Sequence, residues 1–243
     1  MTRLDQNIKA GQENGHLIWS FCNVAVRYMD GDMKRNKTII FLGDGMADEP
    51  IEELGGKTPL QYAHTPAMDS IASHGRSGTL STLLDGFPTS SEVANMSVLG
   101  CDVPTEYCGR GPIEAAGRGI SLGAGDMAFR VNLTAVDRDG ILRDFSGGHV
   151  SDADASSLIQ ELNLKLGTDR IKFHHGVSYR NILVFSDPGL STRVKTEKPD
   201  DHHGDRVSDF MPEAIEPVAV ETAALLRELI IAAPAILENH PVN

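Results

Sequence analysis

The amino-acid sequence predicts an α/β fold in which helices cover a parallel β-sheet. The apolar, β-branched run "TIIFL" at 38–42 is expected of a central parallel strand that is covered on both faces. A helix is predicted over 65–75, because its N-cap threonine, first-turn proline and closing glycine stand in their usual places. A strand candidate at 76–84 and a second helix at 90–100 repeat this order. Strand, helix, strand, helix indicates a parallel sheet with helices packed over it.

A second set of elements follows a glycine-rich connection at 109–126. Residues 126–145 have the character of a hairpin, with Asp139-Gly140 as the turn signal. A helix opened by Ser151 follows, with acidic residues in its first turn. Two further strands are predicted around Gly176. This order predicts an α+β module inserted after the parallel-sheet core.

The end of the sequence contains a polar loop at 195–212 and then one helix, or two helices broken at Pro234. The first residues, in contrast, lack helical or strand periodicity. We expect them to be a poorly ordered extension that results from an over-called start before Met33. The predicted domains are therefore this extension, the N-terminal part of a metal-binding α/β core, and a substrate-binding or lid module that is incomplete, at 1–34, 35–108 and 109–243.

Composition narrows the classes of partner. The chain has 34 acidic and 22 basic residues and a formal net charge of −12. Nucleic acids and anionic membranes need a basic footprint, so neither is an expected partner. No apolar run approaches the ~20 residues of a membrane span, and no convincing signal-peptide cleavage site is present. We therefore expect a cytoplasmic protein.

Asp44 is the first candidate site residue. It lies two residues beyond the predicted strand at 38–42, between Gly43 and Gly45, which allow a tight exit from the strand. Ligands of open parallel sheets gather beyond the carboxyl ends of the strands, and a carboxylate there suits a hard divalent cation. The alternative is an aspartate that only shapes the turn.

The serines near position 91 are the second candidate. Thr89 and Glu92 fit a capping box, so one hydroxyl in this stretch has a purely structural explanation. A helix N-terminus nevertheless favours a phosphoryl group. A serine nucleophile needs a base or a metal, and no histidine stands between His74 and His149. A cation held by Asp44 would supply the activation, so the two motifs make more chemical sense together.

Several long stretches resemble the archaeal-type cofactor-independent phosphoglycerate mutases of the alkaline phosphatase superfamily. The resemblance runs from about Lys37 to Asn243. It rests on "IIFLGDGMADEPIEELGGKTPLQYAHTPAMD", "PTSSEVANMSVLGCD", "GRGPIEAAGRGI", "MAFRVNL", "GVSYRNILVF" and "ILENHPVN". It implies an alkaline phosphatase-like parallel-sheet core, of which this chain holds the N-terminal part.

The resemblance also implies roles for individual residues. Asp44 matches a metal-binding aspartate, and Ser91 matches the nucleophile that contacts metal and becomes phosphoserine. Arg130 and Arg180 match arginines that hold the phosphate or carboxylate of the substrate. The implied activity is the interconversion of 3-phosphoglycerate and 2-phosphoglycerate in glycolysis and gluconeogenesis. It would use two divalent metal ions (Mn, Mg, Zn or Co) and no bisphosphoglycerate.

Two departures from the family pattern keep alternatives open. His149 in "FSGGHV" stands where many relatives carry another residue, so the acceptor could be another alcohol, such as homoserine. Relatives also continue beyond "HPVN" into a second half that supplies further metal ligands. The chain could then be an inactive fragment or a split half, and the expected partners are a homo-oligomer or that missing half. An incomplete sheet is expected to expose apolar surface.

Overall fold

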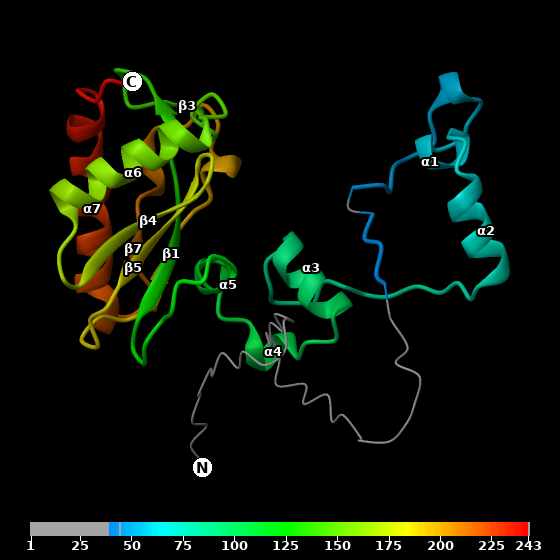
Figure 1. Ribbon diagram of the computed structural model, residues 1–243, viewed down its shortest axis with the longest axis horizontal. Coiled ribbons are helices and arrows are strands. Elements are labelled where there is room, and N and C mark those ends of the chain that lie inside the picture. Colours follow the sequence, from blue (N-terminus) through cyan, green and yellow to red (C-terminus); the bar gives the residue numbers. More distant parts are fainter. Residues whose placement is uncertain (1–38, 44, 243) are drawn as a thin grey trace, which may run out of the picture. The chain divides into compact units, whose positions relative to one another are not determined.

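The computed structural model describes residues 39–43 and 45–242, which form two compact units divided between Glu106 and Tyr107 (Figure 1). The predicted extension at 1–34 therefore lies outside the described residues. The first unit contains the 3₁₀ helix η1 and four α-helices, with the bounds Glu52–Leu54 (η1), Pro59–Tyr62 (α1), Pro66–His74 (α2), Ser91–Val98 (α3) and Val103–Glu106 (α4).

The second unit mixes helices and strands. Its α-helices are Arg110–Gly117 (α5), Asp152–Leu166 (α6) and Val220–Leu237 (α7), and its 3₁₀ helices are Pro199–Asp201 (η2), Val207–Phe210 (η3) and Pro217–Ala219 (η4). Its strands are Met127–Asn132 (β1), Ala135–Val136 (β2), Leu142–Asp144 (β3), Ile171–Val177 (β4), Arg180–Phe185 (β5), Val194–Lys195 (β6) and Glu213–Ala214 (β7).

The parallel strands predicted for the first unit are wrong. Neither the described part of the 38–42 run nor residues 76–84 form a strand. A strand exists only where a neighbouring backbone pairs with it, and the described residues supply none for these two segments. Their side chains are accordingly exposed, to 72% for Ile39, 85% for Phe41 and 68% for Leu80. The α/β class itself is confirmed by the mixture of helices and strands.

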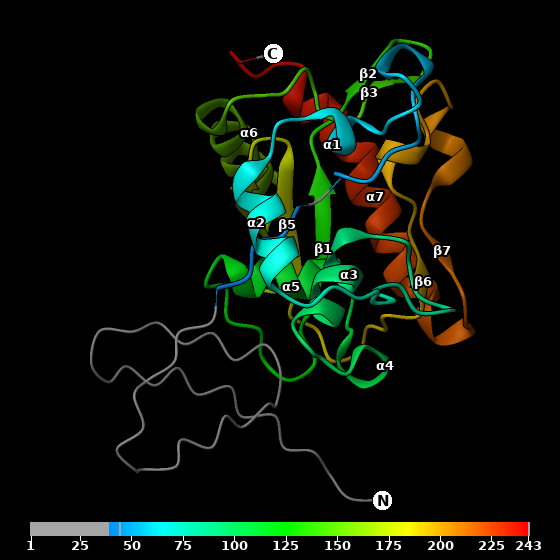
Figure 2. The ribbon, with the colours of Figure 1, turned by 90° about the vertical axis from the view of Figure 1, so that its right-hand side faces the viewer.

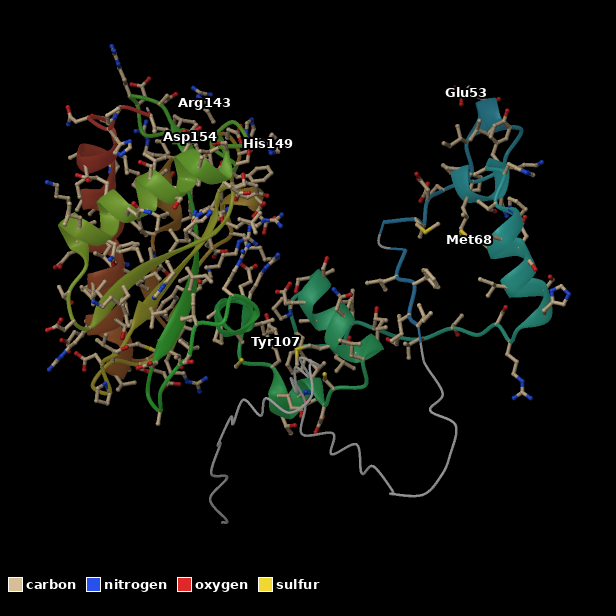
Figure 3. All side chains as sticks on the ribbon, viewed as in Figure 1. Glu53, Met68, Tyr107, Arg143, His149 and Asp154 are labelled. Carbon is tan, nitrogen blue, oxygen red and sulfur yellow. The ribbon has the colours of Figure 1, made fainter. Side chains whose placement is uncertain are left out.

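The predicted helix after Thr65 is confirmed. Helix α2 runs from Pro66 to His74, and its last turn closes when the N–H of Gly75 donates to the carbonyl of Ile71. The side chain of Met68 on this helix is 46% exposed and is labelled in Figure 3. Thr65 is the N-cap, as predicted, but its side chain makes no capping hydrogen bond, and Gly75 has an extended backbone.

The second unit is built on an antiparallel sheet with the strand order β1–β5–β4. One face of the sheet packs on α6 and α7, and this core includes the buried side chains of Phe185, Ile159 and Leu226. The other face packs a smaller cluster that includes Ala115 of α5 and Ile182 of β5. Figure 2 shows α7, in red and orange, running along the length of this unit.

Most predicted elements of the second unit are confirmed. The Asp139-Gly140 turn joins β2 to β3, and Ser151 caps α6 by accepting from the N–H of Asp154 at 3.1 Å. The terminal helix is continuous, with Pro234 inside it. Two predictions need correction. Gly176 lies within β4, and the turn to β5 comes two residues later. The stretch at 109–126, predicted as a glycine-rich connection, contains helix α5. In the part of the chain that the structure describes, no helix combines the length and the apolar character needed to cross a bilayer.

Candidate anion-binding site

Two arginines that are predicted to hold substrate lie on one face of the central sheet. Arg130 in β1 is paired with Ile182 in β5, and Arg180 lies two residues before Ile182 on the same strand. Paired residues of an antiparallel ladder share a face, and so do residues two apart on one strand. Arg130 and Arg180 are therefore diagonal neighbours, although they are far apart in the sequence.

Helix α5 covers the same face and brings a third guanidinium to it. Ala115 is fully buried, and Gly111 lies so close to β1 that a Cβ at this position would overlap the carbonyl oxygen of Ala128. This close packing holds α5 against β1, near enough for the charge of Arg110 to act on Arg130. Nε of Arg110 lies 2.5 Å from Oε1 of Glu114, in an ion pair with i,i+4 spacing.

Arg130 is a cation whose charge is poorly balanced. Its side chain is 15% exposed, and the structure gives its buried Nη2 no hydrogen-bond partner in the described part of the chain. Oδ2 of Asp200 lies 4.0 Å from this nitrogen, beyond hydrogen-bonding distance. Burial lowers the pKa of Arg130, and the positive charge of Arg110 lowers it further. Arginine remains protonated even so, because its ordinary pKa is very high.

We call Arg110, Arg130 and Arg180 the arginine cluster. Arg180 is exposed, its Nη2 donates to the Tyr179 hydroxyl at 2.9 Å, and its guanidinium lies 5.0 Å from the centre of the Tyr179 ring. A hollow of about 400 Å³ opens beside it, lined by Glu114, Gly117, Arg118, Gly176, Val177, Arg180 and Ile182. Arg118 and Arg180 line this hollow, whereas Arg110 and Arg130 are not among its lining residues. Guanidinium groups suit a carboxylate or a phosphate, because their planar forks match both anions.

Arg110 and Glu114 were not predicted as site residues. A usable signal was present in "RGPIEAAG", where the arginine and the glutamate stand four apart and small residues stand between them. Such a pattern predicts a helix that packs closely through its small residues and carries an ion pair on its flank. It does not reveal which strand the helix will lie on.

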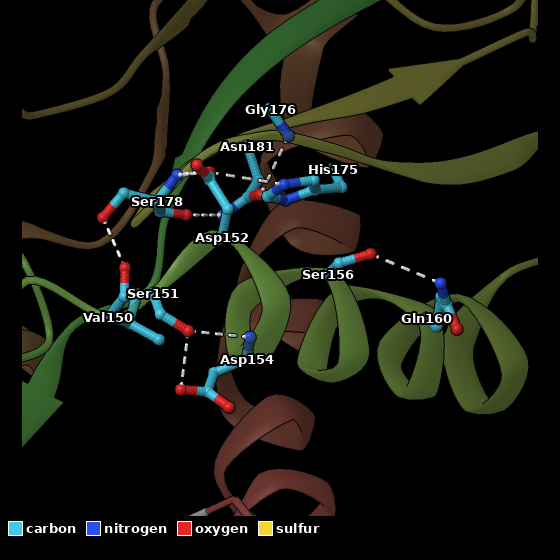
Figure 4. Close-up of polar contacts among 10 residues, drawn as sticks. All are labelled: Val150, Ser151, Asp152, Asp154, Ser156, Gln160, His175, Gly176, Ser178 and Asn181. Atoms are coloured by element: carbon cyan, nitrogen blue, oxygen red, sulfur yellow. Dashed lines mark hydrogen bonds and ion pairs between the residues drawn. The ribbon is translucent and has the colours of Figure 1, made fainter.

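The hairpin that presents Arg180 is held by a buried amide. Asn181 is fully buried, and its Oδ1 accepts from the N–H of Gly176 at 3.1 Å. The same oxygen lies 3.0 Å from Nδ1 of His175, as Figure 4 shows. Gly176 has no room for a Cβ, which would overlap the carbonyl oxygen of Arg180. The two strands therefore approach closely at this point, which fixes where β5 begins.

The turn of this hairpin is also tied to α6. Oδ1 of Asp152 accepts from the N–H of Ser178 at 2.7 Å, and the Ser178 hydroxyl donates to the carbonyl of Val150 at 2.6 Å (Figure 4). Ser178 itself has a φ of 51°, in the left-handed region. These bonds stabilise the turn immediately before Tyr179 and Arg180.

Replacing Asn181 with leucine is expected to lower the free energy of unfolding by about 2–3 kcal/mol, because the buried N–H of Gly176 loses its acceptor. Urea denaturation of wild type and variant measures this difference. The control is Asn239→Leu, which removes an exposed side-chain bond to the carbonyl of Ala235. A change for Asn181→Leu no larger than that of the control would contradict the role of the buried amide.

The segment that carries His149 is organised by Asp144. One carboxylate oxygen of Asp144 accepts from the Ser146 N–H at 2.7 Å and from the Ser146 hydroxyl at 2.6 Å, and the other accepts from the N–H of Gly148 at 2.9 Å. His149 follows with a φ of 56°. Its ring packs edge-on against the ring of Tyr179, with 6.3 Å between the two ring centres. The residue that departs from the family pattern thus contacts the neighbour of Arg180.

Asp144 should make stability depend on pH in the acid range. The hydrogen bonds from Ser146 hold the pKa of Asp144 below its ordinary value. A carboxyl group with a lowered pKa in the folded state stabilises above its unfolded-state pKa, near 3.8, and loses this contribution as the pH falls through the folded-state pKa. Unfolding free energies measured from pH 6 down to pH 2 should therefore fall less steeply for Asp144→Asn than for wild type. The exposed Asp169→Asn variant should keep the wild-type slope; identical slopes for all three proteins would contradict this prediction.

Ser91 is the first residue of α3 and is exposed. The predicted capping box is wrong in its register, because the N-cap is Ser90 and not Thr89. Ser90 has extended backbone angles, with φ −152° and ψ 155°, and its side chain makes no capping hydrogen bond. Ser91 therefore stands at the first helical position, close to the unpaired N–H groups and the positive end of the helix dipole.

Asp44 lies outside the described residues, so its predicted pairing with Ser91 stays a prediction. Within the described ranges, no three or more His, Cys, Asp or Glu side chains gather closely enough to hold a metal ion. These residues do not by themselves make a metal centre, and we derive no step through a bound ion.

Comparison with known proteins shows the family to which this chain belongs. A model of the family described as 2,3-bisphosphoglycerate-independent phosphoglycerate mutase matches residues 72–243. A protein of that name from Methanosarcina mazei is 44% identical over 207 residues, which cover 85% of this chain and 50% of the relative. A protein named as a probable enzyme of the same kind from Geobacter sulfurreducens is 43% identical over 208 residues, covering 84% and 50%. The chain thus spans about half the length of the curated relatives it matches.

Two solved structures are also similar to this chain. The PH0037 protein from Pyrococcus horikoshii is similar with a TM-score of 0.56 and 27% identity, covering 82% of this chain and 44% of that one. The cofactor-independent phosphoglycerate mutase from Thermoplasma acidophilum has a TM-score of 0.49 and 32% identity, covering 82% and 52%.

Proposed function

Because this chain belongs to the 2,3-bisphosphoglycerate-independent phosphoglycerate mutases, we propose that it acts in the interconversion of 3-phosphoglycerate and 2-phosphoglycerate. The observation that carries the proposal is the arginine cluster, in which the buried Nη2 of Arg130 has no hydrogen-bond partner among the residues that the structure describes. The family needs no bisphosphoglycerate, as its name states.

The charge of the substrate fits this cluster. Phosphoglycerate carries a phosphate and a carboxylate, and the chain as a whole carries a net charge of −12. A local excess of guanidinium groups is needed to reverse that field within one hollow. Arg130 and Arg180, with Arg110, would bind one of the two anionic groups through charge-assisted hydrogen bonds. We propose the second unit, accordingly, as the substrate-binding module.

Ser91 is the proposed nucleophile. Its Oγ would form a bond to the phosphorus of the substrate while the phosphorus–oxygen bond to the glycerate breaks, and the proton of the serine hydroxyl would pass to the departing glycerate oxygen. Glycerate, retained in the site, would then attack the phosphoserine with its other hydroxyl and regenerate Ser91. The position of Ser91 at the start of α3 supports this role, because the helix dipole favours the negative phosphoryl group.

We further propose that the activity depends on divalent cations, Mn, Mg, Zn or Co, with Asp44 and Ser91 among their ligands. Bound cations of this kind lower the pKa of a coordinated hydroxyl and offset the charge of a transferring phosphoryl group. Removal of metal with a chelator should abolish activity, and returning one of the four ions should restore it. Full activity after exhaustive chelation would contradict this part of the proposal.

An assay coupled to enolase tests the main proposal. The purified chain, supplied with each of the four cations in turn, should convert 3-phosphoglycerate into a substrate for enolase without added bisphosphoglycerate. A parallel assay should offer homoserine as phosphoryl acceptor, because His149 departs from the family pattern. Transfer to homoserine alone, or no turnover of phosphoglycerate with any cation, would overturn the proposed function.

A further inference from the structure

We propose that Glu114 weakens the binding of anions to the arginine cluster and thereby sets how readily a bound anion leaves. Glu114 acts through Arg110, whose Nε it holds at 2.5 Å, so it is a positioning residue. The link from anion release to turnover rests on the proposed function, whereas the effect on anion affinity does not.

The geometry gives Glu114 three connections to the site. It pairs with Arg110, it raises the pKa of Arg130 through its charge, and it lines the hollow together with Arg180. Its side chain is 25% exposed, so solvent only partly screens the carboxylate. A negative charge in this place has two consequences. It reduces the repulsion among the guanidinium groups, and it repels any anion that enters the hollow.

The anion and Glu114 also share the same donors. The carboxylate engages Nε of Arg110, so an incoming phosphate must either use the other guanidinium nitrogens or displace Glu114. Either way, part of the attraction between the cluster and the anion is offset before binding begins. A site without this carboxylate would hold its anion more tightly and release it more slowly.

The alternative is an ordinary helix-stabilising pair. Ion pairs at i,i+4 spacing contribute only a few tenths of a kcal/mol to helices, and they have no reason to change anion affinity. The chain contains a matched example on α6, where Nζ of Lys165 lies 3.7 Å from Oε1 of Glu161. Neutralising Glu161 changes the net charge by the same amount as neutralising Glu114. Comparing the two variants therefore separates an effect of the Glu114 charge on the arginine cluster from an effect of the net charge of the chain.

The experiment is a calorimetric titration of the purified full chain with inorganic phosphate. Glu114→Gln should bind phosphate about two- to fivefold more tightly than wild type, the range typical of one partly screened charge. The gain should shrink as the salt concentration rises to 1 M, where the Debye length is about 3 Å. Glu161→Gln should bind phosphate like wild type. Glu114→Asp keeps the charge and is expected to keep an affinity close to that of wild type.

Turnover supplies a second readout. In the enolase-coupled assay, Glu114→Gln should lower KM and kcat together, because substrate and product are both held longer. A residue that only stabilised α5 would not tighten phosphate binding. If Glu114→Gln does not fold, as judged by circular dichroism, Glu114→Ser removes the same charge and takes its place.

Equal or weaker phosphate binding by the neutral variants overturns the inference, as does an equal gain in Glu161→Gln. Wild type and neutral variants that all fail to bind phosphate overturn it as well. Tighter phosphate binding without phosphoglycerate turnover would support the inference and count against the proposed function. Phosphoglycerate turnover with unchanged phosphate affinity in the neutral variants would support the proposed function and overturn the inference.

Discussion

Replacing Ser91 with alanine should reduce phosphoglycerate turnover by about 10³-fold or more, because the reaction loses the oxygen that receives the phosphoryl group. The enolase-coupled assay measures the loss. Phosphoglycerate should still bind, because the arginine cluster lies in the second unit of the chain. A Ser91→Ala variant with more than a tenth of the wild-type rate would show that another group is the nucleophile.

The neighbouring serine provides the matched control. Ser90 is the N-cap of α3, and its hydroxyl donates to the carbonyl of Pro88 at 3.4 Å. Ser90→Ala removes the same chemical group one residue earlier and should leave turnover within a few-fold of wild type. Mass spectrometry of acid-quenched reactions provides a direct check, because phosphate should be found on Ser91 in wild type and in Ser90→Ala, and on neither serine in Ser91→Ala.

Replacing Arg130 with methionine should weaken phosphate binding without lowering the stability of the fold. Affinity for inorganic phosphate should fall by about 10–100-fold, the effect expected when charged hydrogen bonds to an anion are lost. The free energy of unfolding should not fall and should rise by up to about 1 kcal/mol. A mostly buried guanidinium whose Nη2 has no hydrogen-bond partner among the described residues is unfavourable, and methionine fills similar space without charge.

The control for this prediction is Arg193→Met. The Arg193 side chain is 64% exposed and pairs with Glu216 at 2.9 Å, so its loss should change neither property by much. Calorimetric titration and urea denaturation of the three proteins provide the two measurements. A marked loss of stability in Arg130→Met would mean that Arg130 serves the fold of the second unit, and unchanged phosphate affinity would remove it from the site.

Arg130 and Glu114 are expected to have opposite effects on the affinity of the site for anions. Arg130 should raise anion affinity at some expense to stability, and Glu114 should lower anion affinity while easing the repulsion among the arginines. A site that turns over a small anion benefits from both, because binding that is too tight slows release. The two substitutions should therefore shift the dissociation constant of phosphate in opposite directions.

Elements with strong local signals could be predicted from the sequence. The proline at the start of α2 fixes its own φ, and the serine that caps α6 and the Asp139-Gly140 turn act through hydrogen bonds to near neighbours. The strand predicted at 38–42 was wrong. Its apolar run describes a surface suited to burial, but a strand also needs a partner backbone, which no local pattern supplies.

The residues of the candidate site, like the secondary structure, could be predicted only in part. The resemblance to the family singled out Asp44, Ser91, Arg130 and Arg180, because motifs preserve the residue types that chemistry needs. The sequence by itself determined the family and the net negative charge, and it supplied these side chains as candidates for the site.

The tertiary structure alone decided which charges meet. The antiparallel register of β1 and β5 makes Arg130 and Arg180 neighbours, and the packing of Gly111 on β1 brings Arg110 and Glu114 beside them. Contacts of this kind depend on how distant segments pack, and electrostatic interactions fall off steeply with distance. The composition of the site could thus be read from the sequence, but its charge balance could be read only from the fold.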